Sequence, residues 1–401
     1  MSLADPTSVS PSVSSHPSQA LLSGTRDPRL DFFRGIAMFI ILIAHTPGNF
    51  LTLWIPARFG FSDATEIFVF CSGMASAIAF GKVFQRQSFA LGCARVVYRI
   101  WQVYWAHIGL FFATAALVAW VNSTGYLERD FVGRLNLYPF FNDDTLQQLI
   151  GLMTLTYVPN YFDILPMYLV VLALMPVVMA LSRINRWAVF AFVGIVWLAA
   201  NFDLIWLPAE PWTDREWFFN PFGWQLIFFT GFAFMMGWLP APPVNRRLIL
   251  IAIAVVILTI PLAYFRIYSQ SELLMEARAS IRFLWTKTDF GLFRYLHFLS
   301  LAYLAWAAVG PRGSRLLPKS NGPLAELWLV ILGAILKVGQ QSLAVFVFSM
   351  FLAQGHGALL DAIGRTTLNV WLVNLWGFFL LVVCAHTAAW FKSQPWRKQK
   401  A

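Results

Sequence analysis

Residues 30–54 read LDFFRGIAMFIILIAHTPGNFLTLW, an apolar segment in which ten non-ionisable residues separate Arg34 from His45. At about 100° per residue, the eleven steps between them complete three helical turns plus roughly 20°. A helix here would carry both side chains on one face, about 16 Å apart along its axis. Ionisable residues inside a membrane are costly, and their presence indicates a functional site.

The composition predicts a membrane protein for the whole chain. Of its 401 residues, 59% are hydrophobic and 12% are charged, whereas an average soluble domain carries about 25% charged residues. Apolar runs of about twenty residues, the length of a membrane-spanning helix, recur along the chain. Because backbone exposed to lipid must satisfy its own hydrogen bonds, we expect an all-α, polytopic membrane helix bundle.

The hydropathy pattern predicts about ten transmembrane helices. They fall near 32–53, 64–84, 96–121, 162–182, 187–207, 222–239, 247–266, 292–310, 341–360 and 368–391. The segment LAELWLVILGAILKVG (324–339) has too few apolar residues before Lys337 to cross comfortably, so we interpret it as an interfacial or re-entrant helix. If it does cross, the spans number eleven and the C-terminus changes sides.

The distribution of charge orients these spans. With the N-terminus in the cytoplasm, each short inner loop carries Lys or Arg, while the outer loops hold most of the carboxylates. This is the positive-inside pattern, and it predicts that both termini are cytoplasmic. The net charge of +10 follows from this topology, so no nucleic-acid partner is expected.

We divide the chain into three parts. Residues 1–25 are rich in Ser and Pro and are expected to form a disordered cytoplasmic tail, after which the first span would act as a signal anchor. Residues 26–392 would form the membrane domain, and residues 393–401 a basic cytoplasmic tail. The three cysteines, Cys71, Cys93 and Cys384, lie in or beside apolar segments and are interpreted as packing residues, with no metal site expected.

Arg34 and His45 are the first candidates for chemistry. In the predicted topology Arg34 lies in the inner leaflet, where its permanent charge suits a phosphate or carboxylate. His45 lies toward the outer face, next to Pro47, which removes a backbone hydrogen bond and opens the helix. A neutral imidazole there could accept a proton from a hydroxyl group. The alternative is a snorkelling arginine and a histidine bonded to a neighbouring helix.

Two carboxylates begin the second span. Asp63 and Glu66 are spaced i, i+3, so one of them could orient His45 and stabilise its imidazolium form. Equally, they could be a solvated helix N-terminus, where the helix dipole favours acids.

A polar stripe enters the third span from the cytoplasmic side. Arg95, Arg99 and Gln102 follow i, i+4, i+7 spacing, which suits phosphate binding. The positive-inside rule alone would also place the two arginines there. Near the outer ends of other spans, Asp163, Arg294 and His297 are candidates for contacts with a polar substrate in an outer cavity.

The same residues carry a resemblance to a known family. The segments RDPRLDFFRGIAMFIILIAHTPGN, FGFSDATEIFVFCSG, YFDILPMYL, FFNPFGWQL, FRYLHFLSLAYL and GQQSLAVF are spread over nearly the whole chain. They resemble membrane-bound acyltransferases that O-acylate extracytoplasmic sugars, and most closely the OpgC-type proteins that succinylate osmoregulated periplasmic glucans.

The resemblance implies a multi-pass protein of the bacterial inner membrane with acyltransferase activity. Acyl-CoA, as succinyl-CoA, would be the donor substrate and would bind from the cytosol near Arg34, Arg95, Arg99 and Gln102; no permanently bound cofactor is implied. His45, supported by Asp63 or Glu66, would accept the proton of a glucan hydroxyl as it attacks the thioester. A double displacement through an acyl-histidine is a second route.

An ion-coupled transporter, or an exporter of glucan, is the main alternative. Intramembrane Arg, His and carboxylate side chains also occur in such carriers. Against this, the chain shows no internal repeat.

Overall fold

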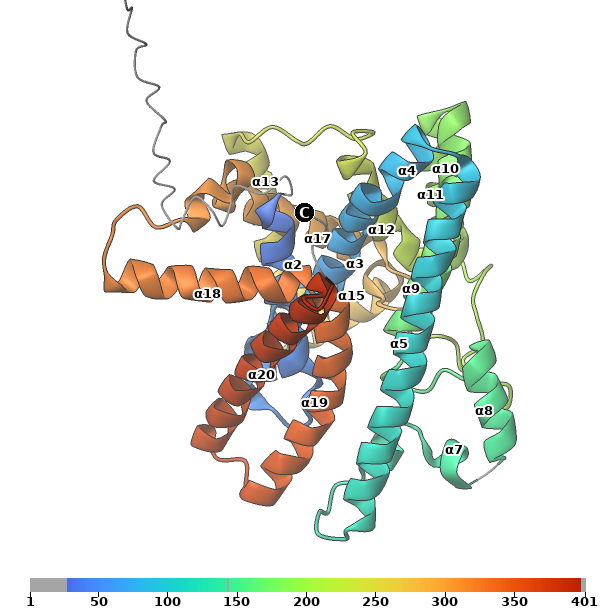
Figure 1. The fold of residues 1–401 in the computed structure, drawn as a ribbon, viewed down its shortest axis with the longest axis vertical. Helices are drawn as coiled ribbons and strands as arrows, with labels where there is room; N and C mark the ends of the chain where they lie inside the picture. Colours follow the sequence, from blue (N-terminus) through green and yellow to red (C-terminus); the bar gives the residue numbers. More distant parts are fainter. Residues whose placement is uncertain (1–26, 143, 398–401) are drawn as a thin grey trace, which may run out of the picture.

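The computed structural model describes residues 27–142 and 144–397, and within these ranges the chain is α-helical with no β-strand. The helices pack side by side as a bundle (Figure 1). This confirms the prediction of an all-α, polytopic membrane protein. The predicted N-terminal tail, residues 1–25, and the last residues of the basic C-terminal tail, 398–401, lie outside the described residues.

The first half of the chain supplies the centre of the bundle. Its helices are α2 (Pro28–His45), η1 (Phe50–Trp54), η2 (Pro56–Arg58), α3 (Ala64–Ser76), η3 (Ala77–Gly81), α4 (Lys82–Arg86), α5 (Phe89–Ser123), α6 (Phe131–Arg134), α7 (Tyr138–Asn142), α8 (Thr145–Thr154), α9 (Ile164–Ala173), α10 (Met175–Ile184) and α11 (Arg186–Asn201). α3, η3 and α4 form one run of helix, with a π-helical turn at η3. With 35 residues, α5 is about 52 Å long, enough to cross a bilayer including its headgroups.

The second half contributes to the same buried core. It contains α12 (Pro221–Met235), α13 (Arg246–Ala263), α14 (Phe265–Tyr268), α15 (Glu272–Ser280), α16 (Arg282–Trp285), α17 (Leu292–Val309), η4 (Pro311–Leu316), α18 (Pro323–Gln340), α19 (Ser342–Ile363) and α20 (Thr367–Ser393). Large aromatic side chains fill the core, and Trp224, Phe111 and Phe228 are fully buried.

Most of the predicted spans correspond to helices long and apolar enough to cross a membrane. Eight described helices meet that criterion, and seven of them match predicted spans. α11 and α12 are apolar but have only 16 and 15 residues. The predicted span 32–53 is wrong in its second half, because α2 ends at His45. Pro47 cannot continue the helical hydrogen-bond pattern, and the short helix η1 follows.

α18 is the segment that we expected to be interfacial. By length and composition alone it is also a candidate span. In Figure 1, however, α18 runs across the direction of α5, which fits a helix lying along the membrane surface. It packs tightly on α2, because a Cβ atom at Gly35 would overlap the Ile335 carbonyl and one at Gly339 would overlap the Asp31 carbonyl.

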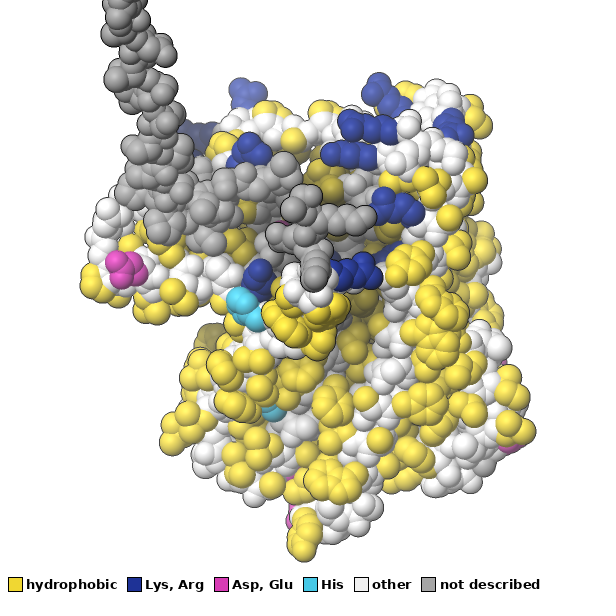
Figure 2. Space-filling model, in the orientation of Figure 1, with side chains coloured by type: hydrophobic (Ala, Val, Ile, Leu, Met, Phe, Trp, Pro, Cys, Tyr) yellow, Lys and Arg dark blue, Asp and Glu magenta, His cyan; other side chains and the backbone are white. Residues whose placement is uncertain are grey.

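Positive charge gathers at one end of the molecule. Figure 2 shows Lys and Arg side chains concentrated at the upper end, where α4 and α10 end and α11 begins, above a wide hydrophobic surface. We call this the basic end. It contains the loops that the positive-inside pattern places in the cytoplasm.

Candidate functional site

His45 is the last residue of α2, and its local structure defines its tautomer. The helix begins at the basic end, where the Asp27 side chain accepts a hydrogen bond from the Arg29 amide and Pro28 occupies the first turn. The Nδ1 atom of His45 lies 2.8 Å from the Ile41 carbonyl oxygen. A carbonyl oxygen only accepts, so Nδ1 carries the hydrogen and Nε2 of the neutral ring is a proton acceptor.

His45 lines a cavity of about 370 Å³ near the end of the bundle opposite the basic end; we call it the outer cavity. Its polar lining comprises His45, Asp63, Tyr161, Asp163 and Lys287, among others, and aliphatic and aromatic side chains make up most of the rest. A mostly apolar pocket with a few converging polar groups is typical of a small-molecule site.

Asp63 reaches this cavity because it caps α3. Its backbone is extended, its Oδ1 accepts a hydrogen bond from the Thr65 amide at 2.6 Å, and Glu66 reaches back to the Asp63 amide at 2.7 Å. The other oxygen, Oδ2, pairs with the Lys287 ammonium at 2.6 Å. Lys287 therefore brings an ammonium group to the cavity wall.

Glu66 lies behind the outer cavity. Its side chain is fully buried and forms an ion pair with Arg294, so the interpretation as a solvated helix N-terminus does not hold for this residue. The described contacts of His45 include neither carboxylate. The imidazole instead bonds the backbone carbonyl of Ile41, one turn earlier in the same helix.

Arg294 and His297 are buried on α17 and do not line the outer cavity. Arg294 pairs with Glu66, and Nδ1 of His297 lies 2.7 Å from the Ser62 hydroxyl. Both side chains hold the start of α3, while Asp163 lines the cavity itself.

Tyr161 completes the surroundings of His45. Its ring meets the imidazole edge to face, with centroids 5.5 Å apart, and its hydroxyl donates to the Met350 carbonyl at 2.5 Å. Its φ angle is +87°, which is rare for a residue with a side chain. Backbone held in such a conformation is concentrated at functional sites.

A second cavity, of about 1030 Å³, lies toward the basic end; we call it the inner cavity. Arg34, Arg95, Arg99 and Gln102 all line it, as does Lys392 of α20. Arg34 bonds the Ser342 hydroxyl, Arg99 bonds Gln102 at 3.2 Å, and Lys392 bonds Gln341 at 2.6 Å. Within the described part of the chain, four cations and no carboxylate line this cavity.

The two cavities lie end to end along shared helices. Phe68 of α3 and Ile164 of α9 line the outer cavity, and Ser72 and Tyr168, one turn further along the same helices, line the inner one. Between them Phe68 stacks on Phe346 of α19, with centroids 5.4 Å apart and ring planes 18° apart. We call this pair the aromatic partition.

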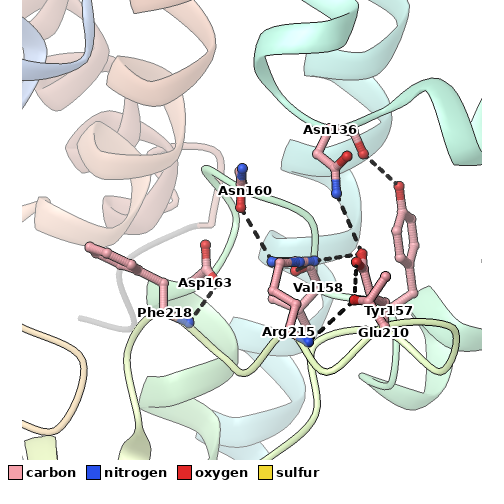
Figure 3. A network of polar contacts seen from close by, with 9 residues as sticks. Asn136, Tyr157, Val158, Asn160, Asp163, Glu210, Arg215 and Phe218 are labelled. Carbon is pink, nitrogen blue, oxygen red and sulfur yellow. Dashed lines mark hydrogen bonds and ion pairs between the residues drawn. The ribbon is translucent and has the colours of Figure 1, made fainter.

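A polar network fixes the loops around the outer cavity (Figure 3). Arg215 pairs with Glu210 at 2.9 Å and donates to the Val158 carbonyl at 2.8 Å, and Asp163 accepts from the Phe218 amide at 3.2 Å. Burial alone would raise the pKa of Glu210, but the hydrogen bonds from Arg215 and Thr213 lower it below its ordinary value.

Sequence reasoning missed several residues of both cavities. Lys287 and Lys392 are ordinary loop and helix-end cations in the sequence, and nothing in their spacing indicates a cavity. Tyr161 and Ser342 fall within YFDILPMYL and GQQSLAVF, two of the segments that carry the family resemblance. Their place in these segments was the one indication in the sequence that they belong to a site.

Comparison with known proteins places the chain in a family. No curated protein and no solved structure matches it. A family model described as "OpgC protein" matches residues 26–393, a range that includes both cavities and every described helix. The protein therefore belongs to the OpgC family of bacterial multi-pass membrane proteins, which serve in the modification of osmoregulated periplasmic glucans.

Proposed function

We propose that this protein transfers an acyl group, succinyl, from cytosolic succinyl-CoA to a hydroxyl group of a periplasmic glucan across the bacterial inner membrane. The observation that carries the proposal is the inner cavity. Its four cations, with no carboxylate among the described lining residues, suit the phosphates of coenzyme A. Its volume of about 1030 Å³ suits a large ligand.

The donor would bind with its phosphates against Arg34, Arg95, Arg99 and Lys392. Gln102 would add a hydrogen bond. The pantetheine arm would extend past the aromatic partition and bring the thioester to the outer cavity. Along α2, Arg34 and His45 are about 16 Å apart, so an extended arm is required.

The glucan hydroxyl would enter the outer cavity from the periplasm. As its oxygen attacks the thioester carbon, its proton passes to Nε2 of His45, which the Nδ1 contact with Ile41 leaves as the acceptor. The C–O bond forms, the C–S bond breaks, and the proton on Nε2 goes to the departing thiolate. The Lys287 ammonium group, which lines the same cavity, would stabilise the negative charge that develops on the carbonyl oxygen.

Purified protein with radiolabelled succinyl-CoA and glucan tests the proposal. We expect label on the glucan with wild type, none above background with His45→Ala, and wild-type transfer with His386→Ala, a histidine exposed on α20 outside both cavities. Movement of glucan across proteoliposomes without labelling would instead indicate a carrier. Wild-type transfer by His45→Ala would remove the role of His45 as base.

A further inference from the structure

Phe218 is exposed and yet belongs to the wall of the outer cavity. Its exposed fraction is 46%, and it lines the same cavity as His45. The cavity wall therefore reaches the surface at this side chain. An exposed apolar ring at the opening of a cavity that also holds charged side chains points to a ligand that contacts both.

The loop presents this ring rigidly. Trp217, on one side, is buried and its amide donates to the Leu207 carbonyl at 2.9 Å. Asn220, on the other side, is buried, caps α12, and donates to the Asp289 carboxylate at 3.0 Å. The Phe218 amide itself is bonded to Asp163. A fixed aromatic surface loses little entropy when a ligand binds to it.

The neighbours of Phe218 are hydrogen-bonding groups suited to hydroxyls. Asp163 and Lys287 line the same cavity, and the Lys287 ammonium lies 5.9 Å from the Phe218 ring centroid. An aromatic face beside carboxylate and ammonium groups matches a sugar ring, which has an apolar face of C–H groups and an edge of hydroxyls.

We propose that Phe218 is the platform on which a glucose ring of the acceptor glucan stacks at the opening of the outer cavity. The residue thereby determines acceptor binding without taking part in the proton transfer at His45. This inference rests on the proposed function for the identity of the reaction, while the platform itself concerns glucan binding alone.

The test compares Phe218→Ala and Phe218→Trp with Phe202→Ala. Phe202 follows α11 at the same end of the molecule, is 71% exposed and does not line the cavity. We expect Phe218→Ala to raise the KM for glucan by roughly threefold to tenfold, the equivalent of one aromatic contact. The KM for succinyl-CoA and kcat at saturating glucan should stay near wild type. Phe218→Trp and Phe202→Ala should leave the KM for glucan near wild type.

An unchanged KM for glucan in Phe218→Ala would overturn the inference. So would an equal rise in Phe202→Ala, which would indicate a general role of aromatic side chains at the membrane surface. Binding of a purified glucan oligosaccharide, measured without donor, separates the two proposals. Glucan binding that depends on Phe218 in a protein without transferase activity would reject the acyl transfer and retain the platform.

Discussion

Arg34 and His45 occupy one uninterrupted helix, and this sets a fixed distance between the two chemical tasks. An α-helix does not stretch, so the group proposed to bind the donor's phosphates stays about 16 Å from the group proposed to accept the proton. Closely packed α18 and the hydrogen bond from Arg365 to the Pro47 carbonyl, at 2.6 Å, restrain the two ends of α2.

Replacing Arg34 by Gln should weaken the binding of coenzyme A. Loss of a hydrogen bond to a charged group costs about 1.5–3 kcal/mol, so we expect Kd to rise roughly tenfold to a hundredfold. Isothermal titration calorimetry of the detergent-solubilised protein measures this. Arg247→Gln is the matched control, since Arg247 is exposed at the basic end and does not line the inner cavity. An Arg34→Gln variant with wild-type affinity would contradict the phosphate contact.

At the scale of residues, helical spacing in the sequence predicted which side chains lie on the same face of a helix. Arg95, Arg99 and Gln102 follow helical spacing on α5, and all three line the inner cavity. The same rule failed to describe Asp63 and Glu66, because Asp63 is a cap with extended backbone and only Glu66 lies in the helix proper. Lys392 lines the same cavity as Arg34 because distant helices pack together, and sequence periodicity gives no information on such packing.

At the scale of helices, the aromatic partition joins α3 to α19 between the two cavities. Phe346→Leu should loosen this stack with a smaller packing loss than alanine would cause. We expect faster release of the coenzyme A thiol from succinyl-CoA in the absence of glucan, because the donor's arm then passes the partition more readily and its thioester meets the water of the outer cavity more often. A thiol-reactive dye measures the release. Phe379→Ala, exposed on α20, should behave as wild type. Equal thiol release in Phe346→Leu and wild type would argue against a partition on the donor's path.

Because α2 and α18 are in close contact, adding a single methyl group between them should lower the stability of the protein. Gly339→Ala should lower the stability of the solubilised protein by about 1–3 kcal/mol, because the new Cβ meets the Asp31 backbone. Gly194→Ala, in α11, has open space around the Cβ position and should leave stability unchanged or raise it by up to about 1 kcal/mol. Thermal unfolding compares the two variants. Equal unfolding midpoints for the two variants would mean that α18 moves away from α2 without loss of stability.

Hydropathy predicted most of the helices, but it did not predict the residues at which they end. The span starting at residue 32 was predicted to continue to 53, whereas α2 ends at His45 and a short helix follows. The short apolar run of α18 predicted an interfacial or re-entrant helix, and its direction across α5 (Figure 1) fits the interfacial interpretation, although length and composition alone also permit a span. Such outcomes depend on tertiary contacts, here the glycine-mediated approach of α18 to α2.

At the scale of the whole molecule, charge separates the two ends. The basic end holds the inner cavity, and the opposite end carries the polar network of Figure 3. That network includes the ion pair between Arg215 and Glu210, and it should make the outer loops sensitive to acid.

Glu210 has a lowered pKa, so its contribution to stability is present above its unfolded value of about 4.5 and is lost as the pH falls through the folded value. The stability difference between wild type and Glu210→Gln should therefore shrink as the pH falls from 6 toward about 3. Thermal unfolding across that range measures it. Burial raises the pKa of Glu216, so the opposite trend is expected for Glu216→Gln. A pH-independent difference for Glu210→Gln would show that the ion pair does not form.

The aromatic partition also has a kinetic consequence. In the proposed reaction the donor and the acceptor bind in different cavities, so their products would leave in opposite directions. Coenzyme A should inhibit competitively against succinyl-CoA and noncompetitively against glucan, and acylated glucan should show the reverse pattern. Initial-rate plots should intersect, as in a sequential mechanism, whereas parallel lines would indicate the acyl-histidine route.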